Sequence, residues 1–182
     1  ASVDYIHERD DRGEVIYRGP HVTRISPMDV VFNPRARTFS KSPKIERTLI
    51  HVAELAELPQ TYTNSGWNEA AIAKAVETRS SAVVDDWVEV IKERGLELDG
   101  FGSWGSYFKQ DMVEVLIYRG DVYDPDTNTS QRNRVLYIVD RLHVIRDAPS
   151  RSPVGMDGLH HAGWRTRNDN LWAQGPLDNL LG

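Results

Sequence analysis

Three apolar segments rich in β-branched residues constrain the fold of this chain more than any other feature of its sequence. They span residues 112–123, 134–139 and 142–146, and a polar turn at 124–132 and a tight Asp140-Arg141 turn join them. Consecutive strands joined by turns are typical of an antiparallel meander. Because the core of the middle segment is apolar at every position, we expect that strand to be covered on both faces.

A β-hairpin is expected at the beginning of the chain. Residues 3–9 and 14–18 flank Asp10-Asp11-Arg12-Gly13, a polar turn that ends in glycine. We expect a third short strand near residues 21–26.

The next segment fits two structures. After a polar loop at residues 38–43, residues 44–51 carry apolar positions that suit either a strand or the first turns of a helix. We expect such a helix to stop at Pro59, because proline disfavours helical backbone in the residue before it.

Two helices are predicted between residues 66 and 94, where apolar residues recur at helical spacing. We expect Asn64 or Ser65 to cap the first helix and Gly95 to end the second. A last short strand is expected at residues 159–164. The sequence therefore predicts an α+β fold in one domain spanning residues 1–182, with antiparallel strands from both ends and a helical insertion at 66–94.

The composition excludes several kinds of site. The chain has 182 residues and no cysteine, so it forms no disulfides and no cysteine-ligated zinc or iron–sulfur sites. With a formal net charge of -5, the chain lacks the overall basic surface of a dedicated DNA-binding domain. We expect a soluble protein, because no apolar run approaches the ~18 residues of a membrane helix and residues 1–10 do not resemble a signal peptide.

Two patterns resemble ligand-binding loops but lack the required context. Residues 100–105 match G-x-G-x-x-G, yet no strand and crossover helix of sufficient length surround them, so a glycine-aromatic loop is the better interpretation. Asp124, Asp126 and Asn128 have the spacing of a calcium loop. However, the positions that require glycine and glutamate hold Thr129 and Val135, so we expect a hairpin turn.

No catalytic, metal or cofactor site is predicted. His160 and His161 lie near Asp157, but adjacent strand residues point to opposite faces and do not easily bind one ion, even with His143. A hydrolytic enzyme with an unidentified carboxylate pair remains an alternative, because 27 acidic residues allow many pairs.

Residues 164–172 form the most unusual segment, with tryptophans at both ends and Arg165 and Arg167 between them. Arginine can stack on an aromatic ring or pair with a nearby carboxylate, which would fix this loop to a neighbouring surface. That surface lies either within the subunit or on another one. A stand-alone module that binds a protein partner through this loop is a further alternative.

A helix is expected to begin directly after this segment. Pro176 follows Gly175 where the first turn of a helix tolerates proline, and Asp178 suits the positive end of the helix dipole. Because a helix of about seven residues is marginal, we expect the chain to be a piece of a longer protein. The alternative is a docked turn capped by Gly182.

The same segment carries a resemblance to a known family. WRTRNDNLWAQGPLDNLLG at 164–182 resembles the connection from the wing domain to the core helices in portal proteins of tailed bacteriophages, especially short-tailed ones. HVTRISPMDVVFNPRARTFSKSPKIERTLIHVAELAEL at 21–58 and the meander are similar to the same family. Ala173-Gln174 departs from it, since the family often has glycine and an apolar residue there.

The resemblance implies a structural, non-catalytic subunit without cofactors. Portal subunits form a ring, usually of twelve copies, at one capsid vertex, through which double-stranded DNA is packaged and ejected without sequence specificity. The implied partners are other copies of the chain, the major capsid protein, the terminase motor and the tail adaptor. The implied location is the virion, with assembly in the host cytoplasm. We expect the wing-to-core junction and ring contacts to depend on seven residues: Trp164, Arg165, Arg167, Asn170, Gly175, Pro176 and Asp178.

Overall fold

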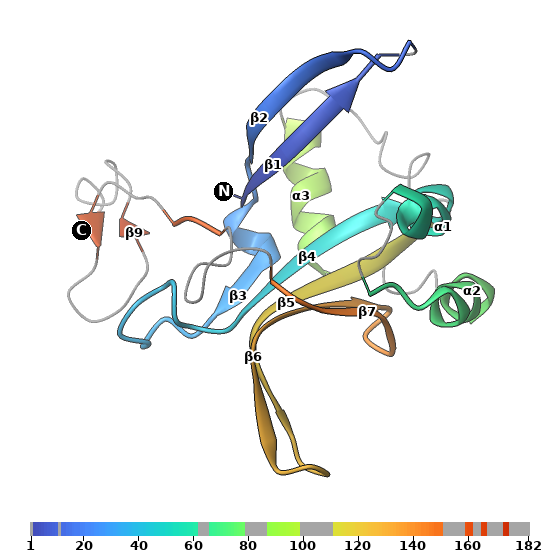
Figure 1. The fold of residues 1–182 in the computed structure, drawn as a ribbon. Helices are drawn as coiled ribbons and strands as arrows, with labels where there is room; N and C mark the ends of the chain where they lie inside the picture. The colour runs from blue at the N-terminus through green and yellow to red at the C-terminus, as the bar shows by residue number, and fades with distance from the viewer. Residues whose placement is uncertain are drawn as a thin grey trace. The chain divides into compact units, whose positions relative to one another are not determined.

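The chain has an α+β fold (Figure 1). The computed structural model describes residues 2–10, 12–61, 66–78, 87–98, 111–150, 159–161, 165–166 and 173–174. Its strands are β1 (Ser2–Arg9), β2 (Val15–Thr23), β3 (Val30–Phe32), β4 (Lys44–His51), β5 (Met112–Asp124), β6 (Thr129–Val139), β7 (His143–Pro149), β8 (Arg165–Thr166) and β9 (Ala173–Gln174). Its helices are α1 (Val52–Thr61), α2 (Glu69–Thr78) and α3 (Trp87–Leu98), with a short 3-10 turn at Pro27–Asp29.

The strands form three sheets. β1 pairs with β2, and β8 pairs with β9, in separate two-stranded sheets. The remaining strands form a five-stranded sheet in the order β3-β4-β5-β6-β7. The predicted α+β class is therefore confirmed.

The predicted N-terminal hairpin is confirmed, and it is longer than expected. β1 pairs with β2 from Ser2 opposite Thr23 to Arg9 opposite Val15. The Asp10 carboxylate shapes the turn by accepting the backbone N–H groups of Arg12 and Glu14 at 2.9 and 2.8 Å. The separate third strand expected near 21–26 is wrong, because residues 21–23 continue β2 and pair with β1.

The ambiguous segment at 44–51 is a strand, and the helix begins only at Val52. The predicted stop at Pro59 is wrong, because α1 continues through Pro59 to Thr61. Proline lacks the N–H that would bond four residues back, and its ring crowds the carbonyl there, which together cost a helix interior about 3 kcal/mol. The helix keeps this proline near its end, where few later turns depend on it.

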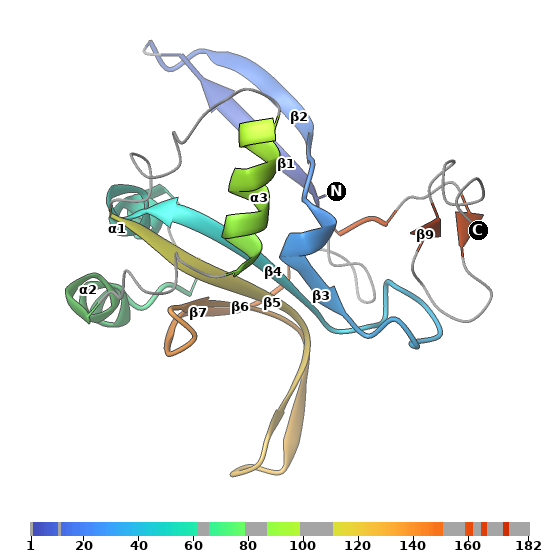
Figure 2. The same ribbon diagram turned by 180° about the vertical axis from the view of Figure 1, so that it is seen from behind.

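Of the three helices that the structure describes between β4 and β5, α2 and α3 are the two predicted for residues 66–94, but their ends differ. Asn68 caps α2, since its side-chain oxygen accepts the backbone N–H of Ala71 at 3.0 Å. The predicted caps, Asn64 and Ser65, precede the helix and lie outside the described residues. Gly95 does not end the second helix, because it lies inside α3, which Figure 2 shows along its length. Glycine in a helix costs only about 1 kcal/mol relative to alanine, so it does not terminate one by itself.

The meander is confirmed, with longer strands than expected. β5 extends to Asp124 and β6 starts at Thr129, so most of the predicted polar turn at 124–132 is strand. Most of its polar side chains are exposed, and side-chain hydrogen bonds support the end of the hairpin, such as the one from the Tyr123 hydroxyl to Asn128 Oδ1 at 2.6 Å. Asp140 and Arg141 both have positive φ angles, and Leu142 N–H bonds to Val139 C=O at 3.0 Å, as in a type I′ hairpin turn. Val135 and Val139 are buried within β6.

The strand expected at residues 159–164 is wrong within the described part of that range. Leu159 is buried but forms only an isolated bridge, and the next two residues are not in a strand. Residues 162–164 lie outside the described residues, and the next described strand is β8. None of the helices in the described ranges has the length and hydropathy needed to cross a membrane.

The chain divides into two compact units, each assembled from segments that are distant in sequence. Unit 1 comprises Ala1–Lys44, Gly120–Asn133 and Ser150–Gly182, and unit 2 comprises Ile45–Arg119 and Arg134–Pro149. The main apolar core lies in unit 2, where helices α1 and α2 pack against the sheet. Its buried members are Leu55, Ile72, Ala75, Val113, Val115, Ile117, Val135, Val139 and Ile145.

Candidate functional site

The structure describes only part of the predicted wing-to-core junction. Arg165 is the first residue of β8 and pairs with Gln174 of β9, while Thr166 pairs with Ala173. This short antiparallel ladder brings together the two ends of the tryptophan-rich segment. The other six predicted residues lie outside the described residues: Trp164, Arg167, Asn170, Gly175, Pro176 and Asp178.

The most strongly organised charged cluster is a buried glutamate with two arginines in unit 2. Glu114, on β5, has no solvent exposure. Its carboxylate accepts a hydrogen bond from Arg47 Nε on β4 at 2.7 Å. Arg141 donates twice to the same carboxylate, from Nε at 2.9 Å and from Nη2 at 3.1 Å. This carboxylate therefore links a neighbouring strand to the β6–β7 turn.

The two arginines determine the charge state of Glu114. Burial by itself would raise the pKa of this carboxyl group. The hydrogen bonds from Arg141 and Arg47, together with their positive charges, outweigh burial and hold the pKa of Glu114 below its usual value. Glu114 is thus a carboxylate at neutral pH and has the environment of a structural ion pair.

A second ion pair on the same sheet joins Arg119 of β5 to Glu46 of β4 at 3.1 Å, and both side chains are largely buried. A third pair, between Arg134 of β6 and Asp147 of β7, is more exposed and has two hydrogen bonds, at 2.9 and 2.6 Å. These pairs connect neighbouring strands, as cross-strand opposite charges do in other sheets.

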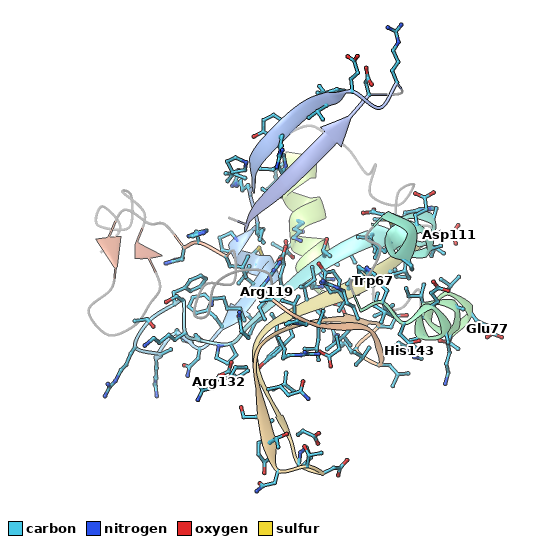
Figure 3. All side chains as sticks on the ribbon, in the orientation of Figure 1. Trp67, Glu77, Asp111, Arg119, Arg132 and His143 are labelled. Atoms are coloured by element: carbon cyan, nitrogen blue, oxygen red, sulfur yellow. The ribbon has the colours of Figure 1, made fainter. Side chains whose placement is uncertain are left out.

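Arg146 on β7 lies against two aromatic rings. Its guanidinium carbon is 5.3 Å from the ring centre of Trp67 and 5.2 Å from that of Tyr137. The two rings meet edge to face at 5.1 Å, and Figure 3 labels Trp67 at this place. Cation–π contacts of this kind stabilise a packed surface. Through this stack, Trp67, which precedes α2, is attached to β7 at the edge of the five-stranded sheet.

The loop between β3 and β4 in unit 1 is built around a buried lysine. Lys44 is 1% exposed, and its ammonium donates to the carbonyl oxygens of Ser40 and Ser42 at 3.4 and 2.9 Å. The same ammonium lies 4.6 Å from the centre of the Phe39 ring. Phe39 in turn packs edge to face on Phe32 and against His161. Lys44 therefore has an internal, shape-determining role.

The turn at 124–128, which has partial calcium-loop spacing, is a hairpin turn, as predicted. Asp124 accepts the N–H of Asp126 at 3.0 Å and the hydroxyl of Thr127 at 2.8 Å. These hydrogen bonds lower the pKa of the Asp124 carboxyl group. Both of its oxygens serve the turn itself.

Histidine contacts do not form a recognisable metal centre in the described ranges. His143, labelled in Figure 3 at the start of β7, lies 3.0 Å through Nε2 from the hydroxyl of Thr78 at the end of α2. That hydroxyl also lies 2.8 Å from the carbonyl of Lys74, as donor. Among the described residues, no group of three or more histidine, aspartate and glutamate side chains is placed to hold a metal ion. The G-x-G-x-x-G segment and Asp157 lie outside those residues.

Sequence reasoning missed the two most organised polar groups, Glu114 and Lys44. The only local signal for Glu114 was an acid inside an apolar run, and its partners are 67 and 27 residues away.

No protein-family model matches the chain, and no curated protein matches it either.

Proposed function

We propose that the protein is a structural subunit of a bacteriophage portal ring, the connector through which viral DNA enters and leaves the capsid. The observation that carries this proposal is the segment at 164–182, whose sequence resembles the wing-to-core connection of such portals. The β8–β9 ladder lies within this segment, and β9 ends directly before Gly175-Pro176.

The order of elements supports the same proposal. Helices α2 and α3 lie between β4 and β5, so a helical insertion interrupts the strands of an otherwise antiparallel sheet. This is the arrangement that we expect of a portal wing. Among the residues that the structure describes, the two carboxyl groups with shifted pKa values are Glu114 and Asp124, and both have lowered values and intramolecular partners, as structural carboxylates do.

The mass of the particle in solution tests the proposal. The full protein would be measured by native mass spectrometry and negative-stain imaging at physiological salt. A closed ring of about twelve subunits is the result expected of a portal, since closed cyclic symmetry requires a head-to-tail interface that returns on itself. A stable monomer would overturn the proposal.

A double substitution tests the junction. We expect Gly175→Ala with Pro176→Ala to reduce the yield of rings strongly while leaving the thermal unfolding of the strands and helices nearly unchanged. Gly95→Ala with Pro125→Ala removes the same two residue types at exposed positions elsewhere and provides the matched control. Normal rings from the junction variant would contradict the assignment of these residues.

A further inference from the structure

The loop between β3 and β4, residues 33–43, concentrates positive charge in an acidic chain. Residues 30–45 include Arg35, Arg37, Lys41 and Lys44 and no aspartate or glutamate, although the whole chain has a formal net charge of -5. A run of one sign confined to a single loop is typical of a surface that binds a polyanion.

Three of these four cations face solvent. Arg35, Arg37 and Lys41 are exposed, and none of them takes part in an ion pair within the ranges that the structure describes. Long side chains with nitrogen at their ends stand out from this loop in Figure 3. Lys44 is instead used inside the loop. We call Arg35, Arg37 and Lys41 the basic loop residues.

The loop is shaped before any partner arrives. Asn33 accepts the N–H of Arg35 on its side chain at 3.0 Å and the N–H of Ala36 on its carbonyl at 3.1 Å. The N–H of Ser42 bonds to the carbonyl of Phe39 at 3.2 Å. The contacts of Lys44 and Phe39 then fix the second half of the loop. A loop ordered in this way loses less entropy on binding than a disordered one.

We propose that the basic loop residues bind the phosphate backbone of duplex DNA without reading its sequence. Guanidinium and ammonium groups are the usual partners of phosphate oxygens, and exposed hydroxyls such as those of Thr38 and Ser40 add donors to the same loop. The inference rests on the proposed portal function for the choice of duplex DNA. Three phosphate contacts per subunit make a weak and salt-dependent attachment, which is compatible with DNA that slides.

The salt dependence of DNA binding tests this inference. Binding of the full protein to a fluorescent, random-sequence duplex of about 24 base pairs would be followed by anisotropy from about 50 to 300 mM salt. The test variant is Arg35→Gln with Arg37→Gln and Lys41→Gln. The matched control is Arg18→Gln with Lys74→Gln and Arg94→Gln, which removes three exposed cations from three other elements.

The expected result is a smaller salt slope in the test variant only. Losing three phosphate contacts lowers the slope of log K against log salt by about 2.7 for each subunit in contact. Wild-type affinity therefore falls about six-fold more than that of the test variant for each doubling of salt. Equal slopes for the test variant and the control, or no binding by the wild type, would overturn the inference.

Measurement of particle mass on the same samples separates this inference from the proposed function. If the protein forms no rings but its DNA binding still depends on the basic loop residues, the portal proposal is wrong and the DNA inference is supported. If the protein forms rings and the test variant binds DNA as the wild type does, the DNA inference is wrong and the portal proposal stands. If the test variant loses its rings and keeps its DNA affinity, the loop binds an acidic surface of a second copy, and the DNA inference is wrong.

Discussion

Replacing Glu114 by glutamine should destabilise the protein by about 3 kcal/mol, because it removes the charge that compensates two arginines. Breaking a buried ion pair from one side costs about 3–5 kcal/mol. We expect the lower end, since the Arg141 side chain is 59% exposed and returns to water, whereas that of Arg47 is only 11% exposed. Glutamine also keeps one oxygen that accepts a hydrogen bond.

Urea denaturation followed by circular dichroism measures this effect. With a urea slope of about 2 kcal/mol per molar, 3 kcal/mol moves the midpoint by about 1.5 M. The matched control is Asp147→Asn, which neutralises the exposed pair with Arg134 and should cost less than about 1 kcal/mol. Hydrogen exchange of the β5 amides locates the loss on the strand that carries Glu114.

Equal midpoint shifts in Glu114→Gln and Asp147→Asn would refute the reasoning, because the carboxylate of Glu114 would then be no more desolvated than that of Asp147. If Glu114→Gln does not fold, Arg141→Gln keeps the question open to measurement. It leaves Glu114 with Arg47 and should fall between the other two variants in stability. The order of the three midpoints is therefore the decisive observation.

Two further predictions concern pH and backbone shape. The folded-state pKa of Glu114 lies below its ordinary value of 4.5, so the stability that its charge contributes is complete above that pH and is lost as the pH falls through the folded-state pKa. The difference in urea midpoint between the wild type and Glu114→Gln should therefore shrink from pH 6.5 to about pH 3.5. A difference that stays constant would contradict this. In thermal unfolding, Gly66→Ala should cost about 2–3 kcal/mol, because φ is +77° and a Cβ atom would lie 2.9 Å from the Asp147 carbonyl oxygen. The control Gly13→Ala, where φ is +82° but the space around a Cβ atom is open, should cost about 1 kcal/mol. Equal costs for the two variants would exclude the close contact at Gly66.

The parts of the fold that sequence predicted were those set by local patterns. The turn Asp10–Gly13 between two strands and the apolar run at 135–139 both specify structure through neighbouring residues. The errors occurred where a residue that disfavours a helix was taken as the end of one. α1 passes Pro59 and α3 passes Gly95, since each costs a helix a limited amount of free energy, which other contacts can offset.

The organised charges were harder to predict for a different reason. Arg47 and Glu114 become neighbours only because β4 pairs with β5, and strand pairing between segments this far apart leaves no periodic signal. Lys44 looks in the sequence like one more surface cation of a basic loop. Only the structure shows that it is buried and bonded to the carbonyls of Ser40 and Ser42, and that this distinguishes it from Arg35.

The interleaving of the two compact units sets an order for folding during synthesis. The last segment of unit 2 ends at Pro149, so all of its residues exist once that point has been translated. Unit 1 also needs residues 150–182, which ribosomes add at about 5–20 residues per second, or about 2–7 s later. The apolar core of unit 2 can therefore form while unit 1 is incomplete. The β8–β9 ladder, at the junction segment, pairs residues that are all translated after the last residue of unit 2.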